Sequence, residues 1–423
     1  MRARFRGPVV VSCALVALAV AGCGSTAEQP AAATVTTSAD QPSVTVSPSA
    51  ELPTGTDVSG PTHATDASAP ATSDPTPRED GADSVPVAGD ADLAALVAPY
   101  VGGTVAPTAM GIAVVDGAEA RRAVAGTVSV GDDTAVGLDA RFHLGSDTKA
   151  MTAVVLAAVL AERGLDLSAT LGTLVPDVPL DPAYAEVSVA QLLAHRSGIV
   201  DEELDIDLSA VVELPSVEGR DVGARAILAA PPQDPTRAFH YSNAGFSIAG
   251  WIAEQLTGDS WEDLVRSRLF EPLGMTCAIG APTGADEPIG HDESGAPDGR
   301  VDTVPEAEGP AGRVSCSMSD WATWARAALD LAEGKASPLL PSAMAAQLFE
   351  VVDGGDYVSG WLVFPGPDGA TAYGHDGSNL HWLARIVLLP SQDRAILLAA
   401  NAADAATSSA FDTLTASLLT PTP

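Results

Sequence analysis

The chain has 423 residues, of which 46% are apolar, and a formal net charge of −34. This length allows one large domain or two to three smaller ones. The acidic balance excludes nucleic acid as a partner, because phosphate binding needs a basic face. We interpret the carboxylates as a solubilising surface, with attraction of cationic substrates as the alternative.

Residues 1–22 predict a signal peptide for a lipoprotein. A basic MRARFRG stretch precedes PVVVSCALVALAV, which is too short to span a membrane comfortably. Ala21 and Gly22 stand before Cys23 as in a bacterial lipobox, which predicts cleavage before Cys23 and a lipid on its thiol. An ordinary secretory signal with an incidental cysteine is the alternative. Cleavage removes three arginines and takes the formal charge to −37 from −34. We therefore expect an extracytoplasmic protein anchored to the bacterial cell membrane.

Residues 23–90 are rich in Ala, Thr, Ser, Pro and Asp, and contain no aromatic residue. Such a segment cannot bury enough apolar surface to offset the entropy lost on ordering. We predict a disordered tether here, followed by one folded domain at 91–420.

Two cysteines, Cys277 and Cys316, remain in the mature folded region. Outside the cytoplasm they either pair as a disulfide or stay as two buried thiols, and the sequence leaves both open.

The folded region begins with a predicted helix at 91–101. Residues 109–130 then predict a strand, a turn at the Asp-Gly dipeptide and a second strand. A helix is predicted from Ser146 to Arg163, ended by Gly164. This helix is apolar on nearly every side, so we expect it to be buried at the centre of the domain.

The middle of the chain, 165–350, mixes helices with long loops. Helices are predicted within 188–199, at 243–258, and after an N-cap at Ser317 or Ser319. The C-terminal part turns to four predicted strands and a final helix, at 358–364, 370–377, 382–390, 395–402 and about 405–419. Strands at both ends with helices between them predict an α/β (α+β) fold, in which one antiparallel sheet is built from both termini beside a mostly helical subdomain.

The stretch GSDTKAMTA places Lys149 three residues after Ser146, at the start of the apolar helix. Residues at this spacing share a helix face, and burial of that face would favour a neutral amine able to take the serine proton. The alternative is a serine N-cap beside an exposed lysine. The apolar residues that follow Lys149 make an exposed lysine the weaker interpretation.

Two further short motifs follow. HYSNAG contains Tyr241 and Asn243 at the start of a predicted helix, and YGHDGSN contains His375 and Gly377 on a predicted strand. In this order, S-x-x-K, Y-x-N and H-x-G resemble the motifs of the penicillin-recognising serine hydrolases. More narrowly, the chain is similar to the class C β-lactamases, the low-molecular-weight D,D-peptidases and related esterases, over about residues 95 to 417. The resemblance implies the β-lactamase/transpeptidase-like fold.

The resemblance also implies roles for the site residues. Ser146 would be the nucleophile and Lys149 its activator, with Tyr241 as the base, either as phenolate or through a relay with Lys149. Asn243 would bind a substrate carbonyl, and His375 would orient Tyr241 or the substrate. The oxyanion hole would consist of the backbone N–H groups of Ser146 and Ser378, with Gly377 keeping side chains out of the substrate's path.

Asp376 departs from the family pattern, since this position usually carries Thr or Ser that helps to hold a substrate carboxylate. A carboxylate there would repel that group by about 1–4 kcal/mol at ~4 Å. Either Asp376 points away from the pocket or the substrate lacks the carboxylate. An efficient β-lactamase is therefore less favoured than an esterase, amidase or D-amino-acid peptidase.

We predict a cell-envelope serine hydrolase that works through an acyl-enzyme on a peptide, amide or ester. It would be D,D-peptidase-like or esterase-like, with weak β-lactamase activity at most. The alternative is a non-turnover penicillin-binding sensor or a scaffold with a dead site. We expect a monomer with no cofactor, and no metal, because H-E-x-x-H and C-x-x-C are missing from the sequence.

Overall fold

The computed structural model describes residues 85–102, 106–204, 211, 213–292, 294–298, 302–335 and 337–419. The predicted signal peptide, Cys23 and the predicted tether up to residue 84 lie outside these ranges. The tether prediction is wrong at its C-terminal end, because Val87–Gly89 forms an edge strand that pairs with the first hairpin. Among the described helices, none combines the length and apolar character needed to cross a membrane.

Two sheets contain the described strands. The strands are β1 (Val87–Gly89), β2 (Ala109–Asp116), β3 (Glu119–Gly126), β4 (Arg141–His143), β5 (Ala278–Ile279), β6 (Val314–Ser317), β7 (Tyr357–Val358), β8 (Trp361–Pro365), β9 (Thr371–Ser378), β10 (Leu383–Leu389) and β11 (Arg394–Ala400). The larger sheet has the order β1-β3-β2-β11-β10-β9-β8-β7, and the smaller has the order β4-β6-β5. Every pairing is antiparallel, and β11 pairs with β2, so the sheet joins the two ends of the domain as predicted.

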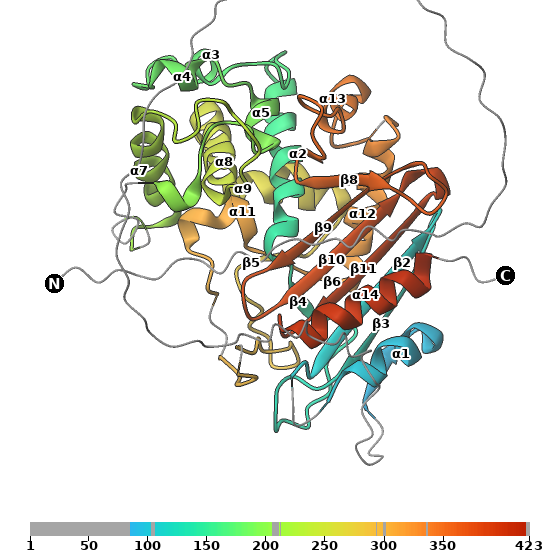
Figure 1. Cartoon of the computed structure of the whole chain (residues 1–423). Coiled ribbons are helices and arrows are strands. Elements are labelled where there is room, and N and C mark those ends of the chain that lie inside the picture. Colours follow the sequence, from blue (N-terminus) through green and yellow to red (C-terminus); the bar gives the residue numbers. More distant parts are fainter. Residues whose placement is uncertain are drawn as a thin grey trace, which may run out of the picture. The chain divides into compact units, whose positions relative to one another are not determined.

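Helices cover both faces of the larger sheet (Figure 1). The described α-helices are α1 (Ala91–Val97), α2 (Thr148–Ala161), α3 (Leu171–Leu174), α4 (Pro182–Ala185), α5 (Val189–Leu193), α7 (Ser216–Ala229), α8 (Asn243–Thr257), α9 (Trp261–Val265), α10 (Glu271–Leu273), α11 (Gly309–Gly312), α12 (Met318–Ala332), α13 (Ser342–Leu348) and α14 (Ala405–Leu419). Short 3₁₀ turns are η1 (Ala98–Tyr100), η2 (Gly145–Asp147), η3 (Asp201–Glu203), η5 (Glu306–Glu308) and η6 (Pro390–Gln392), and η4 (Arg266–Phe270) is a π-helical turn.

The two faces of the sheet enclose separate cores. One core packs α1 and α14 against alternate residues of β2, β10 and β11, among them Ile112, Val387 and Ile396. The other packs α12 against the opposite face and continues into the helices α2, α8 and α9. Strand side chains alternate between faces, so β2, β3, β9, β10 and β11 each contribute to both cores.

Helix ends follow the predicted capping chemistry. Ser317 is the N-cap of α12, and its hydroxyl accepts from the Asp320 N–H. Gly258 ends α8 in the left-handed conformation, with φ +85°. The helix predicted from Ser146 begins instead at Thr148, because Asp147 N–H bonds to Leu144 O and tightens the first turn into η2. Ser146 therefore lies on a 3₁₀ turn ahead of a fully buried helix.

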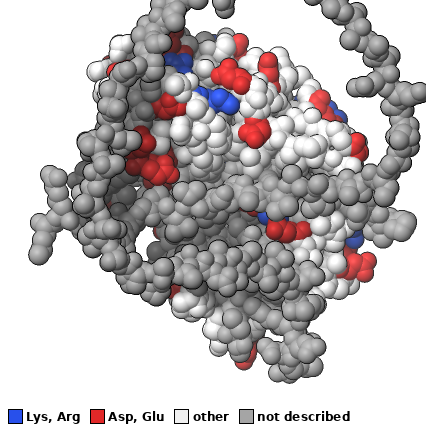
Figure 2. All heavy atoms as spheres, in the orientation of Figure 1, with Lys and Arg blue, Asp and Glu red and all other residues white. Residues whose placement is uncertain are grey.

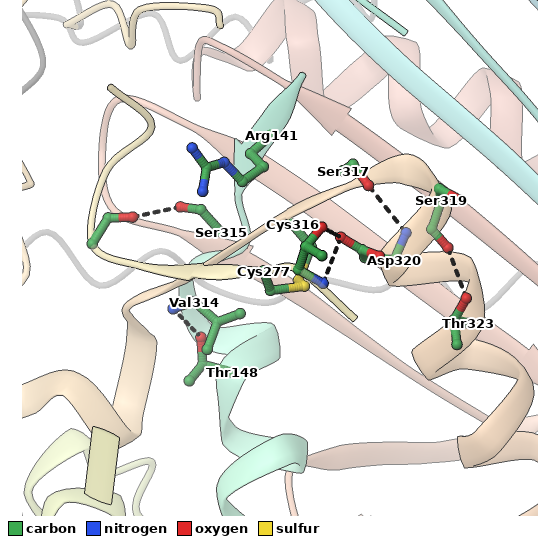
Figure 3. Close-up of a disulfide and its surroundings, with 12 residues drawn as sticks. Arg141, Thr148, Cys277, Val314, Ser315, Cys316, Ser317, Ser319, Asp320 and Thr323 are labelled. Atoms are coloured by element: carbon green, nitrogen blue, oxygen red, sulfur yellow. Dashed lines mark hydrogen bonds between the residues drawn. A yellow bond between two sulfur atoms is a disulfide. The ribbon is translucent and has the colours of Figure 1, made fainter. Parts of the chain in front are cut away.

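A disulfide joins Cys277 and Cys316 across the smaller sheet, with a Cα–Cα distance of 4.4 Å (Figure 3). It anchors β6, whose Val314 contacts the residues immediately before and after η2. The Val314 carbonyl accepts from Leu144 N–H, and its own N–H donates to Thr148 Oγ1 at 3.0 Å. The disulfide thus supports the strand against which the Ser146 turn is built.

Candidate active site

Lys149 is buried at the start of α2, and its amine is surrounded by three oxygen atoms. The Nζ atom donates to Ser146 Oγ at 3.0 Å, to Asn243 Oδ1 at 2.7 Å and to Ala311 O at 2.8 Å. The structure therefore places Lys149 against Ser146 and not at the surface.

These contacts orient the lysine nitrogen. A carbonyl oxygen can only accept, so two N–H bonds point at Asn243 and Ala311. The contact with Ser146 Oγ is made either by an N–H of the ammonium or by the lone pair of the neutral amine. In its neutral form the amine is placed to take the hydroxyl proton as Ser146 attacks.

The turn that carries Ser146 lies directly against strand β9. Gly145 has φ +49°, and a Cβ there would lie 2.5 Å from Ser378 N. A Cβ on Gly377 would lie 2.0 Å from Leu144 O and 2.9 Å from Ser146 N. Gly377 is thus required for the approach of β9 to η2, which differs from the expected role of clearing the substrate's path. This approach brings together the segments that carry the two predicted oxyanion donors, Ser146 N–H and Ser378 N–H.

A buried histidine, His143, supports the turn that carries Ser146. His143 Nδ1 accepts from Gly145 N–H at 3.1 Å, and His143 Nε2 contacts Asp302 Oδ2 at 3.1 Å. Asp302 also contacts Arg313. The local sequence around His143 does not indicate this role, because its partner Asp302 is far away in the chain.

Tyr241 belongs to a group of aromatic rings beside Lys149. The Lys149 amine lies 4.8 Å from the Tyr241 ring centroid, and the His195 ring lies 4.5 Å from that of Tyr241. His195 Nδ1 also accepts from Ser242 N–H at 3.0 Å. Burial lowers the pKa of His195 well below its usual value, and the Lys149 charge acts in the same direction. The neutral His195 therefore helps to hold the segment that carries Tyr241 in place.

Asn243 is oriented by a carboxylate that sequence analysis missed. Asp201 of η3 accepts from Ser242 Oγ at 2.6 Å, Asn243 N–H at 2.7 Å and Ala244 N–H at 3.3 Å. Burial raises the pKa of Asp201, and these hydrogen bonds partly oppose the change. Asp201 accepts from the first N–H groups of α8, where negative charge is favoured, and so holds Asn243 toward Lys149.

His375 lies on β9 with its ring between two buried side chains. Its Nδ1 contacts Asp147 Oδ1 at 3.1 Å, and its Nε2 contacts the Tyr357 hydroxyl at 3.0 Å. Burial lowers the pKa of His375 to about 3, with the Lys149 charge adding to the effect. The His375 ring also stacks at 6.2 Å from Tyr241. His375 is therefore neutral at physiological pH and supplies no positive charge to a substrate.

Asp376 faces the other side of the sheet. Its carboxylate accepts two hydrogen bonds from Arg385, each 2.7 Å long, and Arg385 also binds Asp412 of α14. The two neighbours His375 and Gly377 face η2, as alternation along a strand requires. Of the two alternatives left by the sequence, the structure selects the one in which Asp376 points away from Ser146.

Three side chains at the site were not singled out from the sequence: Asp147, Asp201 and Tyr357. Asp147 stands inside the S-x-x-K motif, but its neighbour His375 is 228 residues away. Tyr357 and Asp201 sit in segments whose local pattern shows only a strand and an acidic loop. The pairing of Tyr357 with His375 depends on the strand order, which the sequence did not specify.

The described residues include no group of three His, Cys, Asp or Glu side chains able to hold a metal ion. Figure 2 shows acidic side chains spread over the visible described surface with fewer basic ones among them.

Ser146, Lys149, Tyr241, Asn243 and His375 come from four separate elements or their flanks and meet at one end of α2, which defines a serine–lysine hydrolase class of site. The chain matches the Beta-lactamase family over residues 93–419 and belongs to that family, whose fold is the one predicted.

Three relatives illustrate the similarity. Penicillin-binding protein 4 of Amycolatopsis lactamdurans is 30% identical over 281 residues, which is 60% of this chain and 70% of that protein. The structure of SurE with D-Leu has a TM-score of 0.61 at 25% identity, covering 77% of this chain and 72% of SurE. A class C beta-lactamase from Rhodobacter sphaeroides has a TM-score of 0.57 at 22% identity, covering 74% of this chain and 95% of that enzyme.

Proposed function

We propose that the protein is a serine hydrolase that forms an acyl-enzyme at Ser146 with a peptide, amide or ester. The observation that carries the proposal is the 3.0 Å contact between Lys149 Nζ and Ser146 Oγ, with the other two lysine contacts made to acceptors. Tyr241, beside Lys149, would return the proton to the leaving group. Asn243 would bind a substrate carbonyl through its amide group.

The neutral state of His375 supports a substrate without a free carboxylate beside the scissile bond. The third motif here carries a buried imidazole that is occupied by Asp147 and Tyr357. We therefore favour an esterase, amidase or D-amino-acid peptidase over an efficient β-lactamase. The likeness to SurE, whose structure contains D-Leu, is consistent with an acyl group of D configuration.

A penicillin-binding sensor is the second candidate, favoured by the similarity to penicillin-binding protein 4. Because Asp376 is paired with Arg385 on the opposite face, its charge is no obstacle in the pocket to a penicillin carboxylate. Such a sensor would be acylated and remain acylated.

Intact-mass measurement after exposure to a fluorophosphonate and, separately, to a penicillin distinguishes these functions. We expect a fluorophosphonate adduct that Ser146→Ala abolishes and that Ser294→Ala, at an exposed serine, retains. Turnover of p-nitrophenyl esters or D-amino-acid amides would identify the hydrolase, and a penicillin adduct stable for hours without turnover would identify the sensor. Absence of any adduct would contradict both the hydrolase and the sensor, and would leave a scaffold with a dead site as the remaining interpretation.

We also propose that the protein is a lipoprotein held at the extracytoplasmic face of the cell membrane. The proposal rests on the signal sequence and the Ala21-Gly22-Cys23 stretch. Globomycin should block maturation, and a Cys23→Ala variant should not be lipidated; normal maturation of that variant would contradict the proposal. The monomeric state remains a prediction, for which light scattering of the soluble domain is the measurement.

A further inference from the structure

Three buried side chains from three elements form a continuous chain beside the nucleophile. Asp147 of η2 contacts His375 of β9 at 3.1 Å, and His375 contacts Tyr357 of β7 at 3.0 Å. Asp147 and Tyr357 are each 2% exposed and His375 is 1% exposed. The chain begins one residue from Ser146 and ends at a hydroxyl in the aromatic group that contains Tyr241.

The chain can hold its protons in two ways, because a neutral imidazole carries one N–H. In the first arrangement, an ionised Asp147 accepts from Nδ1–H, and Nε2 accepts from the Tyr357 hydroxyl. In the second, a protonated Asp147 donates to Nδ1, and Nε2–H donates to the Tyr357 oxygen. The phenolic hydrogen of Tyr357 is then directed at a group other than His375.

The surroundings of Asp147 favour its protonated form. Its Oδ2 atom is buried without a hydrogen-bond partner, which is costly for an ionised carboxylate. The charged groups that act on it are Asp376 of β9, which opposes ionisation, and Lys149 of α2 and Arg385 of β10, which favour it. Burial outweighs the two cations and raises the pKa of Asp147 well above its usual value. The other titratable neighbours of the chain are His195 and Tyr241, packed against the rings of Tyr357 and His375.

We propose that Asp147 is held as a carboxylic acid and that, through His375, it makes Tyr357 a hydrogen-bond donor within the active site. The Tyr357 ring meets the Tyr241 ring edge-on at 6.2 Å, and each lies 4.5 Å from His195. A Tyr357 hydroxyl directed at Tyr241 would stabilise the Tyr241 phenolate, since hydrogen bonds to a charged form favour that form. This last step rests on the proposed function, in which Tyr241 acts as a base. Asp147, His375 and Tyr357 are positioning residues in this scheme.

The tautomer of His375 tests the proposal without any substrate. We expect ¹⁵N NMR of the histidine-labelled folded protein to show His375 in the Nε2–H form at pH 7, with its signals assigned by their loss in His375→Gln. An Asp147→Asn variant should show the same tautomer, because its carboxamide can donate to Nδ1 as the acid does. An Nδ1–H tautomer would overturn the proposal, whatever the enzyme turns out to hydrolyse.

Kinetics test the consequence for Tyr241. We expect Asp147→Ala and Tyr357→Phe each to lower kcat/KM roughly tenfold, the scale of one lost hydrogen bond. Asp147→Asn should restore most of that loss. As pH rises through the raised pKa of Asp147, the wild type should lose its donor form and its activity, whereas Asp147→Asn cannot ionise and should keep activity to higher pH. An Asp147→Asn variant as impaired as Asp147→Ala, with unchanged thermal unfolding, would show that the ionised form is needed and would overturn the proposal.

Discussion

Adjacent residues of β9 lie on opposite faces of the sheet, in environments that differ in burial and in available partners. On the α14 face, the Asp376 carboxylate accepts two hydrogen bonds from Arg385, which also binds Asp412, whose side chain is 51% exposed. On the η2 face, His375 and Asp147 are each 1% exposed at the side chain, and burial shifts both toward their neutral forms. A hydrogen-bonded arginine and contact with solvent are present on the first face, whereas burial without them on the second face favours the neutral forms. A one-residue step along a strand thus separates a structural ion cluster from the catalytic face.

The largest expected effect is on the catalytic face. Lys149→Ala should lower ester turnover by roughly 100-fold or more, the low end of what a positioned proton-transfer group supplies. Lys335→Ala is the matched control, since Lys335 is the other lysine of the chain and its side chain is 50% exposed. Near-wild-type turnover of Lys149→Ala, measured with the fold verified by circular dichroism, would contradict the assigned role.

The disulfide anchors β6, the strand against which η2 is built on the catalytic face. Closing a loop with a sequence separation of 39 residues stabilises by about 2–4 kcal/mol. A Cys277→Ser/Cys316→Ser variant should therefore lose about that much free energy of unfolding in denaturant titrations. Since β6 holds η2, we also expect its Ser146 to react more slowly with fluorophosphonate at temperatures near its Tm. Unchanged stability would indicate that the bond contributes nothing to the fold.

The buried imidazole predicts acid sensitivity. The pKa of His375 is about 3 in the folded protein, whereas the unfolded chain binds that proton near pH 6.5. Stability from this group is present above pH 6.5 and is lost as pH falls toward 3. At pH 4.5 the loss amounts to about 2–3 kcal/mol. His375→Gln should flatten the decline in the free energy of unfolding between pH 6.5 and 4.5, and a slope equal to that of the wild type would refute this assignment.

The α14 face should show the smallest effect on chemistry. Asp376→Asn weakens the bonds to Arg385 and should cost about 1 kcal/mol in the free energy of unfolding. Its rate of acylation by penicillin should change by less than about twofold, the size of a remote effect. A tenfold faster acylation would show that the Asp376 charge does act on a substrate carboxylate, and would remove the contrast between the two faces.

Much of the fold was predictable because local patterns determine its elements. The turn at Gly117, the caps at Ser317 and Gly258 and the final helix lie where the sequence predicted them. The start of the Ser146 helix and the end of the tether were misplaced. The first depends on a 3₁₀ bond from Asp147 to Leu144, and the second on pairing of β1 with a distant strand.

The sequence by itself determined the acidic composition, the elements and the three ordered motifs, because these depend on residue type and spacing along the chain. Only the tertiary structure decided that Lys149 is buried against Ser146, that Asp376 binds Arg385 away from the site, and that His375 joins Asp147 to Tyr357. Each of these depends on which face of a strand or helix meets which distant segment. Burial at those contacts then sets which groups keep their charge, and so which chemistry the site can perform.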